Sequence, residues 1–207
     1  MGKLSRRALL ASAGAALAGC AVELPGQGAP VRLYKLTAAK GFPKGLASLP
    51  WQISVEKPVA SSGLDTARIA LRQRDFAIEY YGRANWIDSA TDMVQSLLIE
   101  SLENSGRLPA VGRDVVGLRP DFVLRSELRD FQAELTSDTA GNVHVRLQAK
   151  LVRMPERTIF ASASHEHVVA FSGAEMERIV VAFDEALRAV LAETVGWAVG
   201  ALPPGRG

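Results

Sequence analysis

Apolar positions recur every three to four residues in two stretches of the chain, which is the spacing of an amphipathic helix. The first stretch follows Ile87, where Ser89 and Asp92 have the spacing of a capping box. Gly106 suits the position just past the end of this helix. The predicted apolar stripe consists of Ala90, Met93, Val94, Leu97, Leu98 and Leu102.

The second helix is expected to start at Ser172, with Glu175 at the matching capping position. Charged side chains occupy the face opposite its apolar stripe, and they exclude a membrane-spanning helix. This stripe consists of Met176, Ile179, Val180, Phe183, Leu187, Val190, Leu191 and Val195.

Most of the remaining apolar residues follow the two-residue period of strands, most clearly between Val143 and Val152. A hairpin is expected around Arg74 and Asp75. The order is strands, helix, three long antiparallel strands and helix, which favours a mixed α/β or α+β layer. We therefore predict an α/β fold, a mixed sheet with long antiparallel strands and two main amphipathic helices packed on it. The expected strands cover residues 31–37, 52–56, 68–72, 76–81, 122–135, 143–152 and 158–171.

The first residues have the pattern of an export signal. Lys3, Arg6 and Arg7 precede an uncharged stretch from Ala8 to Gly19. This stretch is far shorter than the roughly 20 residues that span a bilayer, but it has the length of a signal-peptide core. We predict a signal peptide at residues 1–19. The segment Ser5 to Leu10 also resembles a twin-arginine signal, so the export route stays open.

The signal ends in Leu17-Ala18-Gly19-Cys20, which looks like a lipobox. Cys20 is the only cysteine, so no intramolecular disulfide can form and its thiol is the expected lipidation site. The alternative is a cysteine that only happens to close a signal peptide. Ala21 follows it where Asp is the usual inner-membrane retention residue in enteric bacteria, which favours the periplasmic face of the outer membrane.

The composition of the remaining chain indicates three segments. Residues 20–30 are rich in Gly and Pro and suggest a flexible tether, residues 31–202 one folded domain, and residues 203–207 a disordered tail. Removing the three basic signal residues lowers the formal charge from +2 to −1. A near-neutral processed chain lacks the basic footprint of a nucleic-acid-binding protein.

The sequence contains no nucleophile elbow and no phosphate-binding loop. His165 and His167 would share one face of a strand and could hold an ion, while Glu166 would point to the other face. A closed site needs further ligands, and His144 is the remaining histidine. Histidines at an exposed or core-edge strand position are the simpler interpretation. We expect no catalytic activity, no metal and no cofactor.

Tyr80, Tyr81 and Trp86 form an aromatic group that precedes the first predicted helix. Two interpretations stay open, a core cluster at the start of the helix and a contact surface for a partner or lipid.

The chain resembles the ABC-type transport auxiliary lipoproteins, a family that includes paraquat-inducible protein C. The resemblance rests on the lipobox and on a series of short segments in a fixed order. They are Tyr34-Lys35-Leu36, Ile53-Ser54-Val55 ahead of Pro58, residues 63–69, Tyr80-Tyr81, Ala84-Asn85-Trp86, residues 102–106 and residues 127–131.

This resemblance implies a three-layer α/β fold and an accessory role in an ABC lipid transporter of the mammalian-cell-entry type. The expected partner is the periplasmic lipid-carrier protein of that system, together with the membrane that holds the lipid anchor. The alternative is an envelope structural or regulatory lipoprotein, such as a cell-wall synthase activator or an assembly factor. A lipoprotein enzyme is a weaker option. The sequence leaves the oligomeric state open, a homo-oligomer included.

Overall fold

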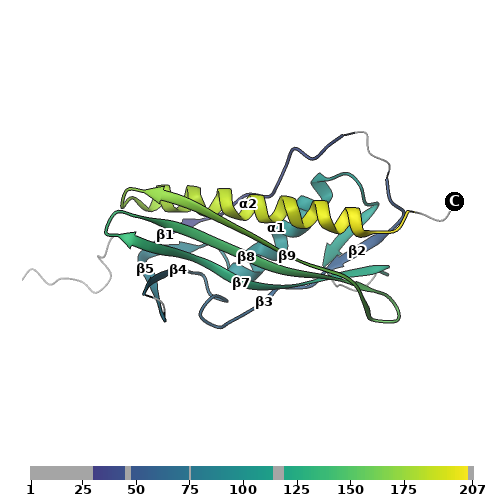
Figure 1. The fold of residues 1–207 in the computed structure, drawn as a ribbon, viewed down its shortest axis with the longest axis horizontal. Helices are drawn as coiled ribbons and strands as arrows, with labels where there is room; N and C mark the ends of the chain where they lie inside the picture. The colour runs from purple at the N-terminus through teal and green to yellow at the C-terminus, as the bar shows by residue number, and fades with distance from the viewer. Residues whose placement is uncertain (1–29, 45–47, 75, 114–118, 205–207) are drawn as a thin grey trace, which may run out of the picture. The chain divides into compact units, whose positions relative to one another are not determined.

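The computed structural model describes residues 30–44, 48–74, 76–113 and 119–204 (Figure 1). The chain divides into two units, residues 1–30 and 31–207, and the fold below is that of the second unit. The predicted signal peptide, Cys20 and nearly all of the predicted tether lie outside the described residues.

The described residues form a mixed sheet of nine strands, and the long strand β7 (Phe122–Ser137) organises it. One edge of β7 pairs antiparallel with β8 (Ala140–Arg153), which in turn pairs with β9 (Thr158–Ser172). The other edge of β7 is shared by three parallel strands in succession, β2 (Gln52–Val55), β3 (Val59–Ala60) and β4 (Arg68–Arg74). Beyond these, β6 (Ala110–Arg113) pairs with β2, β5 (Ala77–Trp86) pairs with β4, and β1 (Arg32–Tyr34) pairs with β5.

Helix α1 (Ala90–Asn104) begins and ends as predicted. The Ser89 hydroxyl accepts a hydrogen bond from the Asp92 backbone N–H at 3.3 Å. The Asp92 carboxylate accepts hydrogen bonds from the Ser89 hydroxyl at 2.6 Å and from Lys57 at 2.8 Å, so it ties the helix start to the preceding loop. Gly106 follows the helix with a φ of +63°, which costs glycine little and other residues more.

Helix α2 (Met176–Ala201) begins later than predicted. Ser172 is the last residue of β9, so it does not cap the helix. Glu175 occupies the N-cap position and its side chain makes no capping hydrogen bond there. Gly173, at a φ of +104°, turns the chain from strand to helix. The predicted capping box at Ser172 is therefore wrong, although the predicted helix and its apolar stripe are present.

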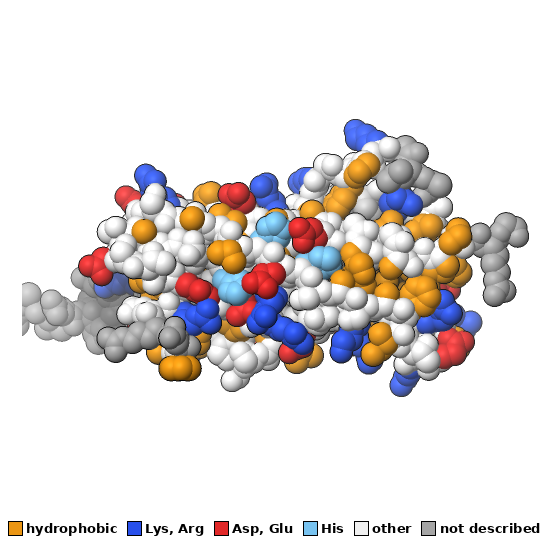
Figure 2. Space-filling model, viewed as in Figure 1, with side chains coloured by type: hydrophobic (Ala, Val, Ile, Leu, Met, Phe, Trp, Pro, Cys, Tyr) orange, Lys and Arg blue, Asp and Glu red, His pale blue; other side chains and the backbone are white. Residues whose placement is uncertain are grey.

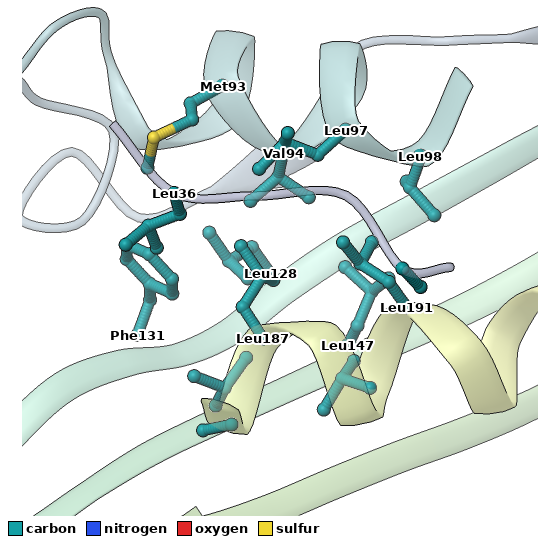
Figure 3. Close-up of a cluster of buried hydrophobic side chains, with 14 of the residues drawn as sticks. Leu36, Met93, Val94, Leu97, Leu98, Leu128, Phe131, Leu147, Leu187 and Leu191 are labelled. Carbon is teal, nitrogen blue, oxygen red and sulfur yellow. The ribbon is translucent and has the colours of Figure 1, made fainter. Parts of the chain in front are cut away.

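Both helices contribute to a single core (Figure 3). Leu128 on β7 and Leu147 on β8 are cross-strand partners, so their side chains point to the same face of the sheet. Figure 3 shows them in one cluster with Val94 and Leu98 of α1 and Leu191 of α2. The helices thus form one layer on one face of the sheet. This confirms the α/β class, the mixed sheet and the two packed helices, but the described residues form two layers instead of the three that the resemblance implied.

Strands β3 and β6 are not anticipated in the sequence, and the two residues of β3 are too few to display a period. Strand β5 extends five residues beyond the predicted end, to Trp86. Within the described part of the chain, no helix combines the length and the apolar composition needed to cross a membrane.

Candidate interaction surfaces

The three aromatic residues singled out in the sequence lie in different environments. Trp86 is 1% exposed and packs against Phe131 and Phe183, with ring centroids 5.6 and 5.1 Å away. Its indole therefore belongs to the core, which is the first of the two interpretations that the sequence left open. A surface contact through Trp86 is not compatible with this position.

Tyr80 and Tyr81 are both half-buried but differ in their hydrogen bonding. The Tyr80 hydroxyl donates to the Gly63 carbonyl at 3.1 Å, and the Arg68 guanidinium lies 3.6 Å from the centre of its ring. The Tyr81 hydroxyl is buried without a partner among the described residues. Burial raises the pKa of Tyr81 to about 12, because the phenolate would lose its hydration there.

The same strand carries exposed apolar side chains that sequence reasoning missed. Phe76, just before β5, is 100% exposed, and Ile78 is 41% exposed. Both lie at the turn end of the β4–β5 hairpin. A fully solvated phenylalanine is rare in a soluble domain unless a partner covers it. The sequence did offer a signal for this surface, because the apolar Phe76 directly follows the turn predicted around Arg74 and Asp75.

The two histidines of β9 lie on the face that α2 covers, and they share one carboxylate from that helix. His167 Nε2 is 2.8 Å from Glu193 Oε1, and His165 Nδ1 is 3.3 Å from Glu193 Oε2. The hydrogen bond from His167 is the main reason that the pKa of Glu193 lies below its usual range. The His165 ring also lies against Trp197 in a tilted arrangement, with the ring centroids 6.0 Å apart.

Glu166 points to the opposite face, as the strand period predicts, and is 2.8 Å from His144 Nε2. His144 Nδ1 is 3.2 Å from Glu134, which also pairs with Arg72. This ion network crosses β4, β7, β8 and β9. Figure 2 shows the three histidines of the chain close together on one side of the molecule, beside acidic and basic side chains.

All three histidines thus contact carboxylates that link neighbouring elements. Within the residues that the structure describes, no group of three histidine, cysteine or acidic side chains is arranged to hold a metal ion. The arrangement has the chemistry of a hydrogen-bonded clamp between β9 and α2.

Comparisons with known proteins place this fold among bacterial relatives. The chain is 27% identical to protein XCC0632 of Xanthomonas campestris, whose crystal structure superposes with a TM-score of 0.76 over 82% of this chain and 95% of the other. A second crystal structure, of an uncharacterized protein, is 10% identical and has a TM-score of 0.55, with 81% and 95% of the two chains covered.

An uncharacterized protein of Bradyrhizobium diazoefficiens is 27% identical over 181 residues, which make up 86% of this chain. The chain spans about half of that relative's length, 48%. The family model described as the ABC-type transport auxiliary lipoprotein component matches residues 34–195, which run from the end of β1 to the last turns of α2. The chain belongs to the family of ABC-type transport auxiliary lipoproteins.

Proposed function

We propose that this protein is held by lipid on Cys20 at the periplasmic face of the outer membrane, where it docks the lipid-carrier protein of a mammalian-cell-entry-type ABC transporter. It acts by binding and not by catalysis. The observation that carries the proposal is the family match, which spans most of the folded unit and associates the chain with ABC transport. The lipobox-like segment before Cys20 supports the anchor, and Ala21 supports the outer membrane.

The turn end of the β4–β5 hairpin is the surface that we assign to carrier docking. Phe76 and Ile78 expose apolar area there, and the half-buried ring of Tyr80 adjoins them on β5. Aromatic side chains are enriched among the residues that dominate binding energy at protein interfaces. Arg68, stacked on Tyr80, offers a cation at the edge of this patch.

The test is a pull-down of the carrier encoded beside this gene, with the processed chain as bait. Phe76→Ser together with Ile78→Ser should abolish capture, while the melting temperature stays within about 2 °C because both side chains are solvated. Val181→Ser is the matched control, since Val181 on α2 is 64% exposed and lies outside the hairpin.

Loss of capture in the hairpin variant and normal capture in the control would support the proposal. Equal capture by both variants would remove the hairpin as the docking surface. No capture by the wild type, together with normal lipid traffic in a deletion strain, would favour the structural or regulatory lipoprotein instead.

A further inference from the structure

The helix-free face of the sheet carries a groove that the docking surface does not use. It has a volume of about 440 Å³ and lies where β3 and the start of β9 flank β7 and β8. Val59 and Ile159 form apolar walls and are 69% and 62% exposed, while Val152 is buried at 3%. The size falls within the range of about 300–1,000 Å³ that is usual for small-molecule sites.

Two cations that line this groove have no counter-ion in the part of the chain that the structure describes. Of the charged residues that line it, Arg125 pairs with Glu56 at 2.8 Å and Glu127 with Arg129 at 3.1 Å. Lys150 and Arg157 have no ion-pair partner among the described residues. The groove therefore combines apolar walls with an excess of two positive charges.

The position of Arg157 is held by an uncommon backbone conformation. Arg157 lies in the turn between β8 and β9 with a φ of +57°. Non-glycine residues in this region cost free energy and concentrate at functional sites. Lys150 alternates along β8 with the buried residues Ala149 and Leu151, so its side chain points away from the core.

The groove suits a lipid better than a peptide or a nucleic acid. Strand β8 is paired on both edges, and β3 pairs with β7 beside the groove, so the floor offers no free strand edge to an extended peptide. A near-neutral processed chain with two isolated cations lacks the extended basic surface that a nucleic acid needs. Figure 2 shows hydrophobic and basic side chains side by side around the turn between β8 and β9.

We propose that this groove binds one anionic phospholipid, with the phosphate at Lys150 and Arg157 and the first part of an acyl chain between Val59 and Ile159. Arginine binds phosphate through paired hydrogen bonds and lysine binds it as a point charge. The proposal rests on the proposed function, because it gives the auxiliary lipoprotein a direct contact with the transported class of molecule.

The experiment is a titration of the processed chain, residues 20–207, with Cys20→Ser so that no lipid is attached. This form contains the whole folded unit. The ligand is dihexanoyl phosphatidylglycerol below its micelle concentration, followed by NMR chemical shifts. Dihexanoyl phosphatidylcholine has the same acyl chains but no net charge, so it tests whether a negative headgroup is needed. Glycerol 3-phosphate has the negative charge but no acyl chains, so it tests whether the chains are needed.

We expect saturable binding of the phosphatidylglycerol and at least about ten-fold weaker binding of the other two ligands. Lys150→Gln with Arg157→Gln should weaken phosphatidylglycerol binding at least about ten-fold, and Val59→Ser with Ile159→Ser should do the same. Lys35→Gln with Lys44→Gln removes as much charge from exposed positions outside the groove and should leave binding unchanged.

The proposal would be overturned if phosphatidylcholine bound as tightly as phosphatidylglycerol, or if glycerol 3-phosphate bound and phosphatidylglycerol did not. It would also be overturned if neither pair of groove substitutions weakened phosphatidylglycerol binding. The titration contains no carrier protein, and the pull-down varies the hairpin and not the groove. Failure of lipid binding is therefore distinguishable from failure of carrier docking.

Discussion

The buried Tyr81 hydroxyl should contribute little to the stability of the fold. Its hydroxyl has no partner among the described residues, so Tyr81→Phe removes an unsatisfied polar group and should leave stability unchanged or raise it by up to about 1 kcal/mol. Tyr80→Phe is the matched control, because it loses the bond to Gly63 and should cost about 0.5–1.5 kcal/mol. Urea unfolding measures both, and a clear loss of stability in Tyr81→Phe would contradict the expectation.

The same residue predicts a loss of stability at high pH. The folded pKa of Tyr81, about 12, lies above its ordinary value of 10.0. Its contribution to stability is therefore complete below pH 10 and is lost as the pH rises toward 12. In Tyr81→Phe this part of the alkaline loss should be absent, whereas Tyr80→Phe should retain it. Unfolding curves between these two pH values provide the measurement.

Trp86 gives the third prediction at the residue scale. Trp86→Ala should cost about 3–5 kcal/mol, because it leaves a cavity against Phe131 and Phe183. Trp86→Phe should cost clearly less, since it keeps a ring there and removes a buried indole N–H that has no partner among the described residues. Equal thermal stability of wild type and Trp86→Ala would show that the side chain is not part of the core.

The sequence could not distinguish these aromatic residues because the strand that carries them is irregular. Pairing of β4 with β5 shifts register between Arg68 and Ala70, and Arg83 has a φ of +59°. A strict two-residue period would have placed Tyr80 and Trp86 on the same face. The irregularity lies between them, so Trp86 reaches the core while Tyr80 stays half-buried.

At the scale of elements, Glu193 holds the end of the helical layer against the sheet. Its folded pKa lies below the ordinary value of 4.5, chiefly because of the hydrogen bond from His167. A depressed carboxyl pKa contributes stability above the unfolded value, and this stability is lost as the pH falls through the folded value. Glu193→Gln should therefore lower the melting temperature at pH 6 and have little effect at pH 3.

Glu185→Gln is the control for this prediction, since Glu185 is an exposed acid on the same helix. It should leave the pH dependence of the melting temperature unchanged. A pH-independent effect of Glu193→Gln would show that packing, and not ionisation, accounts for the role of Glu193.

The long elements were predictable and their mutual contacts were not. Helix α1 and strand β8 display complete periods, so their buried faces can be assigned from the sequence alone. The contact of Glu193 with the β9 histidines joins residues 26 and 28 positions apart, and no local pattern indicates it. The groove likewise combines β3, β7, β8 and β9, and β3 has too few residues to be predicted.

At the scale of the whole molecule, the two proposed surfaces use different parts of the sheet. The hairpin patch lies at the turn end of β4 and β5, whereas the groove is built on β3, β7, β8 and β9. A carrier docked on the hairpin would not need to cover the groove residues. The two proposed activities can thus be separated by substitution, and in the proposed function the protein performs both while it is attached to the membrane.

Cys20 should supply that attachment, and the last prediction concerns its removal. A diacylglyceryl group provides two acyl chains, which is enough for stable anchoring where one chain is marginal. Cys20→Ala should therefore block fatty-acid labelling and processing by the lipoprotein peptidase, while the wild type should resist extraction with high salt. Because Cys20 is the only cysteine, no other thiol complicates the labelling.

The membrane to which the protein is attached can be tested separately. On a density gradient the wild type should follow the outer membrane, and Ala21→Asp should shift it to the inner membrane in an enteric host. A wild type that salt removes would contradict the anchor, and one that sediments with the inner membrane would contradict the localisation.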